Sequence, residues 1–168
     1  MFVFIRAVTY AALFIGLVLV FLPAQLLSPS GIARPGMIGA LQVAGMVVSV
    51  GGGAIALWCI LSFAAVGRGT PAPFDPPRRL VVRGPYAVVR NPMYIGAGLA
   101  LAGASMVYQS LPLLGYTAGF FFVTHLFVVL YEEPTLRHTF GTDYESYCRQ
   151  VRRWWPRPWE GRGRPGAA

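Results

Sequence analysis

The chain has few charged residues for its length and contains no lysine. Of its 168 residues only 12% are charged and 55% are hydrophobic, and the mean hydropathy is +0.56. Soluble globular domains carry about twice that share of charged residues. This composition excludes an ordinary soluble domain and predicts an integral membrane protein.

Cysteine, histidine and acidic residues are also scarce, with two, two and six of them. Cys59 lies in an apolar stretch and Cys148 in a basic one, so the two cysteines do not have metal-ligand spacing. We therefore expect two free thiols and no metal site.

All fourteen basic residues are arginine, and the net charge is +8. Nucleic-acid-binding proteins share such a charge balance. Here, however, twelve of the fourteen arginines flank apolar stretches, five within 67–91 and seven within 137–164. That is the positive-inside distribution of membrane proteins. It predicts no nucleic-acid partner and places both termini and the 67–91 loop on the cytoplasmic side, in a bacterial inner (plasma) membrane.

Four apolar stretches predict an all-α fold with about four transmembrane helices, at 7–22, 37–66, 92–108 and 112–131. The first resembles a secretory signal, but we expect an uncleaved span. The second is longer than a bilayer requires. Its triple glycine at 51–53 suggests a bend, whereas Gly45, Ser49 and Gly53, four residues apart, predict a close helix contact. The last two stretches are joined by a short turn, which predicts a helical hairpin.

Three regions follow from this pattern. Residues 1–66 hold two N-terminal helices, 67–156 hold a polar loop, the hairpin and an amphipathic tail helix, and 157–168 form a disordered tail. The tail helix contains Tyr144 and Tyr147, and three tryptophans with arginines follow it, a composition typical of a segment in the membrane interface.

Polar residues that could carry chemistry occur in three places on the predicted cytoplasmic side. They are the 83–94 loop and helix start, the pair Glu132 and Glu133, and Arg152 with Arg153. Asn91 and Pro92 are suited to the N-cap and first position of a helix, whose free amides attract anions.

The glycines and acids of these segments each have two readings. Gly96 and Gly98 allow a ligand or a neighbouring helix to approach closely. Glu132 and Glu133, at the negative end of a helix, either pair with arginines or bind an amine, a sulfonium or ribose hydroxyls. His125 either lines a cavity or packs as a neutral side chain inside the bundle.

The sequence G-P-Y-x3-R-N-P-x-Y-x-G at 84–96, the acids at 132–133 and L-x3-F-G-x2-Y-x2-Y-x3-V-x-R-x2-P at 136–156 together resemble a known superfamily. It is the superfamily of isoprenylcysteine carboxyl methyltransferases and phospholipid methyltransferases. The resemblance extends over 82–156 and implies a helical membrane bundle that binds S-adenosyl-L-methionine at its cytosolic face and takes a lipophilic substrate from the bilayer. It implies cofactor contacts from Pro85, Tyr86, Asn91, Pro92, Tyr94, Gly96, Gly98, Glu132 and Glu133.

The expected catalytic residues are Arg90, Asn91 and Arg153. The superfamily often has histidine where this chain has Asn91, and an asparagine is no general base. A carboxylate acceptor needs none, and Arg90 or Arg153 would orient it bidentately. An amine acceptor would need Glu132, Glu133 or Tyr94 to take a proton. The carboxylate is therefore slightly preferred.

Two other functions remain open from the sequence. One is an NADPH-dependent membrane reductase resembling the sterol reductases, and the other is a non-catalytic membrane adaptor. The expected partners are membrane lipids and a lipophilic acceptor, such as a lipid, a quinone or a small hydrophobic acid. The sequence predicts no oligomeric state.

Overall fold

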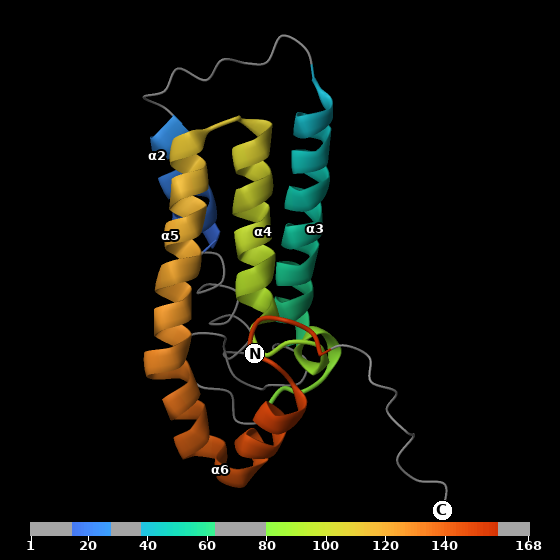
Figure 1. Cartoon of the computed structure of the whole chain (residues 1–168), viewed down its shortest axis with the longest axis vertical. Coiled ribbons are helices and arrows are strands. Elements are labelled where there is room, and N and C mark those ends of the chain that lie inside the picture. Colours follow the sequence, from blue (N-terminus) through green and yellow to red (C-terminus); the bar gives the residue numbers. More distant parts are fainter. Residues whose placement is uncertain (1–14, 28–37, 63–79, 158–168) are drawn as a thin grey trace, which may run out of the picture.

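The computed structural model describes residues 15–27, 38–62 and 80–157, and within these ranges every regular element is a helix (Figure 1). The elements in chain order are η1 (Ile15–Phe21), α2 (Leu22–Leu27), α3 (Ala40–Ser62), η3 (Gly84–Ala87), α4 (Pro92–Val107), α5 (Leu111–Phe127), η4 (Val128–Glu132) and α6 (Glu133–Gln150). The predicted all-α class is confirmed for this part of the chain.

Two helices are long and apolar enough to cross a membrane by length and composition, α3 and the helical stretch Leu111–Gln150. Gly16–Leu27 and Pro92–Val107 are shorter apolar helices. The number of four spans stays a prediction, because half of the first predicted span, 7–22, lies outside the described residues. So does most of the predicted disordered tail, 157–168.

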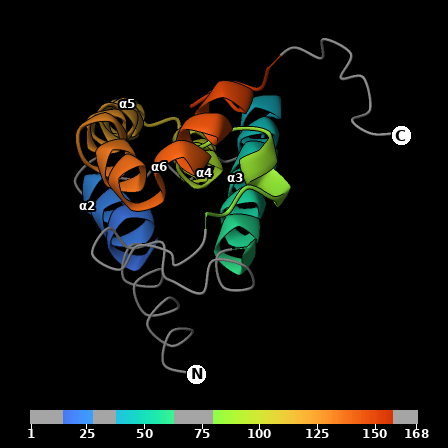
Figure 2. The same ribbon diagram turned by 90° about the horizontal axis from the view of Figure 1, so that it is seen from below.

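The helix Leu111–Gln150 is too long to be a single span. Its 40 residues extend over about 60 Å at the α-helical rise, roughly twice the hydrocarbon thickness of a bilayer. The sequence turns polar at Glu132, and Gly141 (φ 51°, ψ −124°) interrupts the helical backbone within α6. The apolar half, through Tyr131, is therefore the part suited to a membrane, and α6 extends beyond it and turns back beneath α4 (Figures 1 and 2).

The predicted hairpin of α4 and α5 is confirmed. Gln109 takes a positive φ of 48° between the two helices, and Ser110 caps α5 by accepting a hydrogen bond from the Leu113 amide at 3.3 Å. Pro112 occupies the first turn of α5, where its missing N–H costs no hydrogen bond.

Helices α3 and α4 pack backbone against backbone through four glycines. A Cβ atom on Gly45 would lie 2.7 Å from the carbonyl oxygen of Gly103, and one on Gly52 would lie 2.5 Å from that of Gly96. Ser49 lies between these contacts and donates to the Ala100 carbonyl at 3.0 Å. Such close approach of two apolar helices depends on the absence of side chains.

This interface corrects two expectations about the triple glycine. The packing face continues from Ser49 to Gly52, whereas Gly51 and Gly53 have no atom within 4 Å of an added Cβ. Repeated steps of four residues drift around a helix of 3.6 residues per turn, so a step of three restores the face. Helix α3 also runs through all three glycines without interruption, so the expected bend is absent.

The helices form a row with α4 between α3 and α5, and α2 lies beside α5 (Figures 1 and 2). Tyr116 of α5 donates to the Val18 carbonyl of η1 at 2.9 Å. Tyr147 of α6 donates to the Tyr86 carbonyl of η3, the short helix that contacts α3, at 2.6 Å. That bond fixes the returning helix against the loop that precedes α4.

Candidate functional site

The predicted polar residues meet at one end of the helices, where α4 begins and η4 ends. We call this region the polar end. It consists of residues 90–94 at the start of α4, Glu132 and Glu133 where α5 passes into α6, and residues 151–157, which follow α6 and which we call the strap. These segments are far apart in the sequence and join because α6 returns toward α4.

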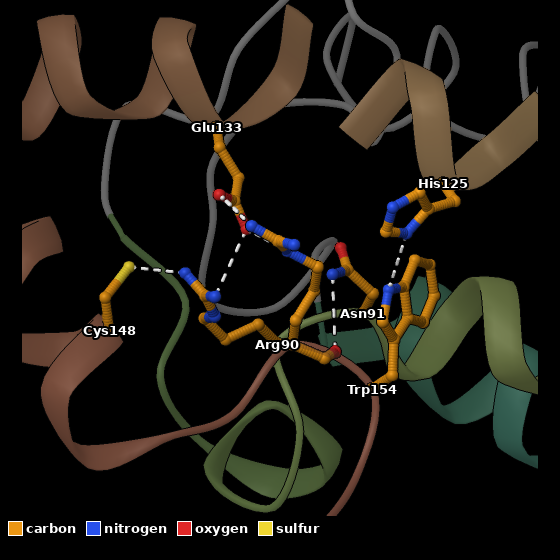
Figure 3. Close-up of polar contacts among 7 residues, drawn as sticks. Arg90, Asn91, His125, Glu133, Cys148 and Trp154 are labelled. Carbon is orange, nitrogen blue, oxygen red and sulfur yellow. Dashed lines mark hydrogen bonds and ion pairs between the residues drawn. The ribbon is translucent and has the colours of Figure 1, made fainter. Parts of the chain in front are cut away.

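Glu133 is the centre of this arrangement and is only 4% exposed. Arg153 of the strap binds it through two parallel hydrogen bonds, from Nε to Oε1 at 2.7 Å and from Nη2 to Oε2 at 2.8 Å. Arg90 adds an ion pair from Nη2 to Oε1 at 3.2 Å (Figure 3). Two guanidinium groups from different segments therefore share one buried carboxylate.

The ionisation of this cluster follows from its geometry. Burial raises the pKa of Glu133, but the hydrogen bonds from Arg153 and the charges of Arg90 and Arg153 outweigh burial and hold that pKa below its ordinary value. The same hydrogen bonds raise the pKa of Arg153. Glu133 is consequently ionised, and its charge is already balanced by protein groups.

Arg90 and Asn91 also hold the backbone of the strap. The Arg90 amide donates to the Arg152 carbonyl at 2.9 Å. The Asn91 Nδ2 donates to the Arg153 carbonyl at 3.3 Å (Figure 3). Asn91 stands at the N-cap of α4 as predicted, but its side chain makes no capping bond. Its buried amide serves the strap instead.

Glu132 is in a different situation from its neighbour. Its Oε2 accepts a hydrogen bond from the Tyr94 hydroxyl at 3.1 Å, which joins η4 to the start of α4. Among residues 15–27, 38–62 and 80–157, no basic side chain forms an ion pair with it. It ends the π-helical turn η4, and such turns within α-helices frequently occur at functional sites.

The structure thus separates the two roles that the sequence left open for the acids. Within the described part of the chain, Glu133 pairs with arginines and Glu132 keeps a carboxylate that no cation balances. Both predicted catalytic arginines, Arg90 and Arg153, are engaged by Glu133.

Pro85 and Tyr86 lie in η3, on the side of the polar end nearest α3. Tyr86 is buried in an apolar cluster with Cys59 and Val81, and Gly84 precedes it with a positive φ of 61°. Pro92 begins α4 and is buried. Their role in cofactor binding stays a prediction.

Gly96 and Gly98 face protein neighbours. A Cβ on Gly96 would meet the backbone of α3, 2.7 Å from the Gly52 carbonyl oxygen, and a Cβ on Gly98 would overlap the ring of Phe121. Both glycines therefore have the packing function that the sequence left open, and their contact with a cofactor stays a prediction.

Three contacts were not predicted. Cys148 accepts a hydrogen bond from Arg90, Tyr147 binds the Tyr86 carbonyl, and Trp154 donates to His125 Nδ1 at 3.1 Å. His125 is exposed, contrary to both readings that placed it inside the bundle. The two tyrosines spaced at Y-x2-Y signalled a buried helix face, but no local pattern indicates the partners of Cys148 or Trp154.

A family model described as phospholipid methyltransferase matches residues 41–143. The chain belongs to the phospholipid methyltransferase family. This confirms the resemblance noted from the motifs and makes the protein a membrane methyltransferase. No curated protein and no solved structure gave a significant match.

The match covers α3, the hairpin, both acids and the first part of α6, and it ends before the strap. The Tyr94–Glu132 pair therefore lies within the matched residues, whereas Arg153 and Trp154 lie beyond them.

Proposed function

We propose that the protein transfers a methyl group from S-adenosyl-L-methionine to the amine of a membrane aminophospholipid, at the polar end. The observation that carries this proposal is Glu132, a partly buried carboxylate bound by Tyr94 and balanced by no basic side chain in the described part of the chain. A site of this kind attracts a cationic ligand.

The residues present fit this cofactor. Bound S-adenosyl-L-methionine supplies an electrophilic methyl group on a positively charged sulfur. Glu132 and Tyr94 offer acceptors for its cationic groups. The first-turn amides of α4, which the Asn91 side chain does not cap, suit a carboxylate.

The arginines bear on the choice of acceptor. The carboxylate acceptor was slightly preferred because it needs no general base, and Arg90 or Arg153 was expected to orient it. Both arginines are engaged by Glu133. An amine acceptor needs no cationic clamp. It does have to lose one proton. We propose that Glu132 accepts that proton on Oε1, while the Tyr94 hydroxyl stays hydrogen-bonded to Oε2.

We further propose that the polar end faces the cytoplasm of a bacterial inner (plasma) membrane, with four spans and both termini inside. The support is the arginines gathered at this end, at 83, 90, 137, 149, 152, 153 and 157, which follow the positive-inside rule.

The test uses membranes containing the wild-type protein, Glu132→Gln or Glu145→Gln, incubated with methyl-labelled S-adenosyl-L-methionine. Glu145 is an exposed acid of α6 and gives a matched control. We expect label in extracted phosphatidylethanolamine derivatives for the wild type and Glu145→Gln, and at least tenfold less for Glu132→Gln.

Binding measurements on the purified proteins decide between the remaining functions. We expect the wild type to bind S-adenosylhomocysteine and not NADPH. Binding of NADPH instead would establish the reductase, and binding of neither would favour the adaptor. Equal labelling by Glu132→Gln and wild type would overturn the assignment of Glu132.

A further inference from the structure

The backbone of the strap is fixed at its first residues. Val151 is buried against Tyr144 and Tyr147, and the carbonyls of Arg152 and Arg153 accept hydrogen bonds from Arg90 and Asn91. The Arg153 side chain is held by Glu133. The strap up to Arg153 is therefore part of the rigid polar end.

Trp154 is the next residue, and its side chain leaves the strap to reach α5. The indole Nε1 donates to Nδ1 of His125 at 3.1 Å, and the two ring centroids are 6.0 Å apart (Figure 3). An indole N–H can only donate, so Nδ1 of a neutral His125 accepts. This is a single neutral hydrogen bond between two side chains, one half-buried and one exposed.

His125 belongs to the outer surface of α5. Its neighbours Phe122, Val123 and Leu126 are exposed and apolar, with 64%, 62% and 40% of their surfaces accessible, as expected of residues that face lipid. On the same continuous helix, His125 precedes Glu132 by about two turns. The Trp154–His125 bond thus links the polar end to the apolar outer surface of α5, about two helical turns before Glu132.

We propose that the Trp154 side chain, held by His125, is a gate through which the lipophilic acceptor passes from the bilayer, between α5 and the strap, to Glu132 and Tyr94. This inference rests on the proposed function. The gate opens by rotation of one side chain, because the preceding backbone is fixed and a single hydrogen bond holds the indole. Tryptophan suits this place, since its ring is apolar and its N–H finds a polar partner at a membrane interface.

The first experiment removes the hydrogen bond. Trp154→Phe keeps an aromatic ring without the N–H, and His125→Phe keeps a ring without the acceptor. The control is Trp155→Phe, because Trp155 follows directly and is 76% exposed. Each protein is reconstituted in vesicles of phosphatidylethanolamine and phosphatidylglycerol, with methyl transfer to phosphatidylethanolamine and S-adenosylhomocysteine binding as readouts.

We expect both gate variants to lower the KM for phosphatidylethanolamine by about threefold, because one neutral hydrogen bond no longer favours the closed state. S-adenosylhomocysteine binding should stay within twofold of wild type, and Trp155→Phe should change neither quantity. Unchanged KM values in both gate variants would overturn the gate.

The second experiment closes the gate covalently. The double variant His125→Cys and Trp154→Cys is joined by a short bifunctional methanethiosulfonate, which a reductant removes. The two single-cysteine variants receive the same reagent and control for reaction at Cys59 and Cys148. We expect more than a tenfold loss of transfer to phosphatidylethanolamine in the joined protein, with S-adenosylhomocysteine binding retained and turnover restored by reduction.

The outcomes separate the gate from the function on which it rests. Retained S-adenosylhomocysteine binding with undiminished turnover in the joined protein would overturn the gate alone. A wild-type protein that binds no S-adenosylhomocysteine, or that does not methylate phosphatidylethanolamine, would overturn the proposed function and the gate with it.

Discussion

The α3–α4 interface and the polar end are held together by opposite means. The first depends on atoms that are absent, since Gly45, Gly52, Gly96 and Gly103 let two backbones touch. The second depends on charges that are present, since Arg90 and Arg153 share the Glu133 carboxylate.

The difference lies in what each region tolerates. A glycine contact tolerates no added volume but is indifferent to charge and pH. An ion cluster accommodates small changes of shape but not the loss of a partner. The packing of α3 against α4 is thus determined by the small size of the glycines, and the polar end is held together by electrostatic interactions.

The largest expected effect comes from adding one methyl group to the glycine interface. Gly52→Ala places a Cβ against the Gly96 carbonyl oxygen and the Ala100 amide, and neither backbone atom can move without shifting α4. We expect a loss of about 3 kcal/mol in the free energy of unfolding. Reversible unfolding in detergent micelles measures it.

The triple glycine supplies its own controls. Gly51→Ala and Gly53→Ala add the same methyl group where nothing lies within 4 Å. Their free energies of unfolding should stay within about 0.5 kcal/mol of wild type. Equal destabilisation at all three positions would contradict the interface and indicate a general effect of alanine on α3.

The second effect comes from removing the shared carboxylate of the polar end. Glu133→Gln leaves Arg90, whose side chain is 11% exposed, and Arg153 without their anion. Breaking a buried pair costs several kcal/mol, and partial exposure of Arg153 reduces this to about 2 kcal/mol here. The same unfolding measurement applies, with Glu145→Gln as the neutral surface control.

The pH dependence of stability checks the same cluster. The folded pKa of Glu133 lies below its ordinary value, so its contribution is present above that value and is lost as pH falls through the folded pKa. We expect the wild type to lose more stability on acidification across this range than Glu133→Gln does. Parallel pH profiles for the two proteins would show that folding does not lower the pKa of Glu133.

This contrast also explains which parts of the structure could be predicted from the sequence. The α4–α5 hairpin was predictable because its signals are local, namely Pro92 at the start of α4, Ser110 before α5 and a turn too short for other structures. A small-residue packing face on α3 was predicted correctly. The assumed spacing of four residues, however, placed Gly53 on that face in place of Gly52. Local periodicity locates a helix more securely than it locates a face.

The polar end was harder to predict because its contacts join segments far apart in the chain. The sequence predicted that five polar residues lie on the same side of the membrane: Arg90, Asn91, Glu132, Glu133 and Arg153. It could not distinguish the two adjacent acids, because nothing local in the sequence indicates their partners. Their different partners depend on the turn of η4 and on the return of α6. The Trp154–His125 bond could not be predicted from the sequence, because the two residues are 29 positions apart and His125 was expected inside the bundle.

The smallest effect distinguishes the two acids by ligand binding. Tyr94→Phe removes the hydrogen bond to Glu132 and leaves the Glu133 cluster intact. Loss of the hydroxyl leaves the Glu132 carboxylate without the group that orients it, so S-adenosylhomocysteine should bind about fivefold more weakly. The free energy of unfolding should fall by no more than the contribution of one hydrogen bond, about 1 kcal/mol. Tyr108→Phe, at the exposed hairpin turn, should leave the affinity unchanged. Calorimetric titration of the three proteins provides the measurement. If Tyr94→Phe lost stability but no affinity, the Tyr94–Glu132 pair would belong with the structural contacts of the bundle and not with a cationic ligand.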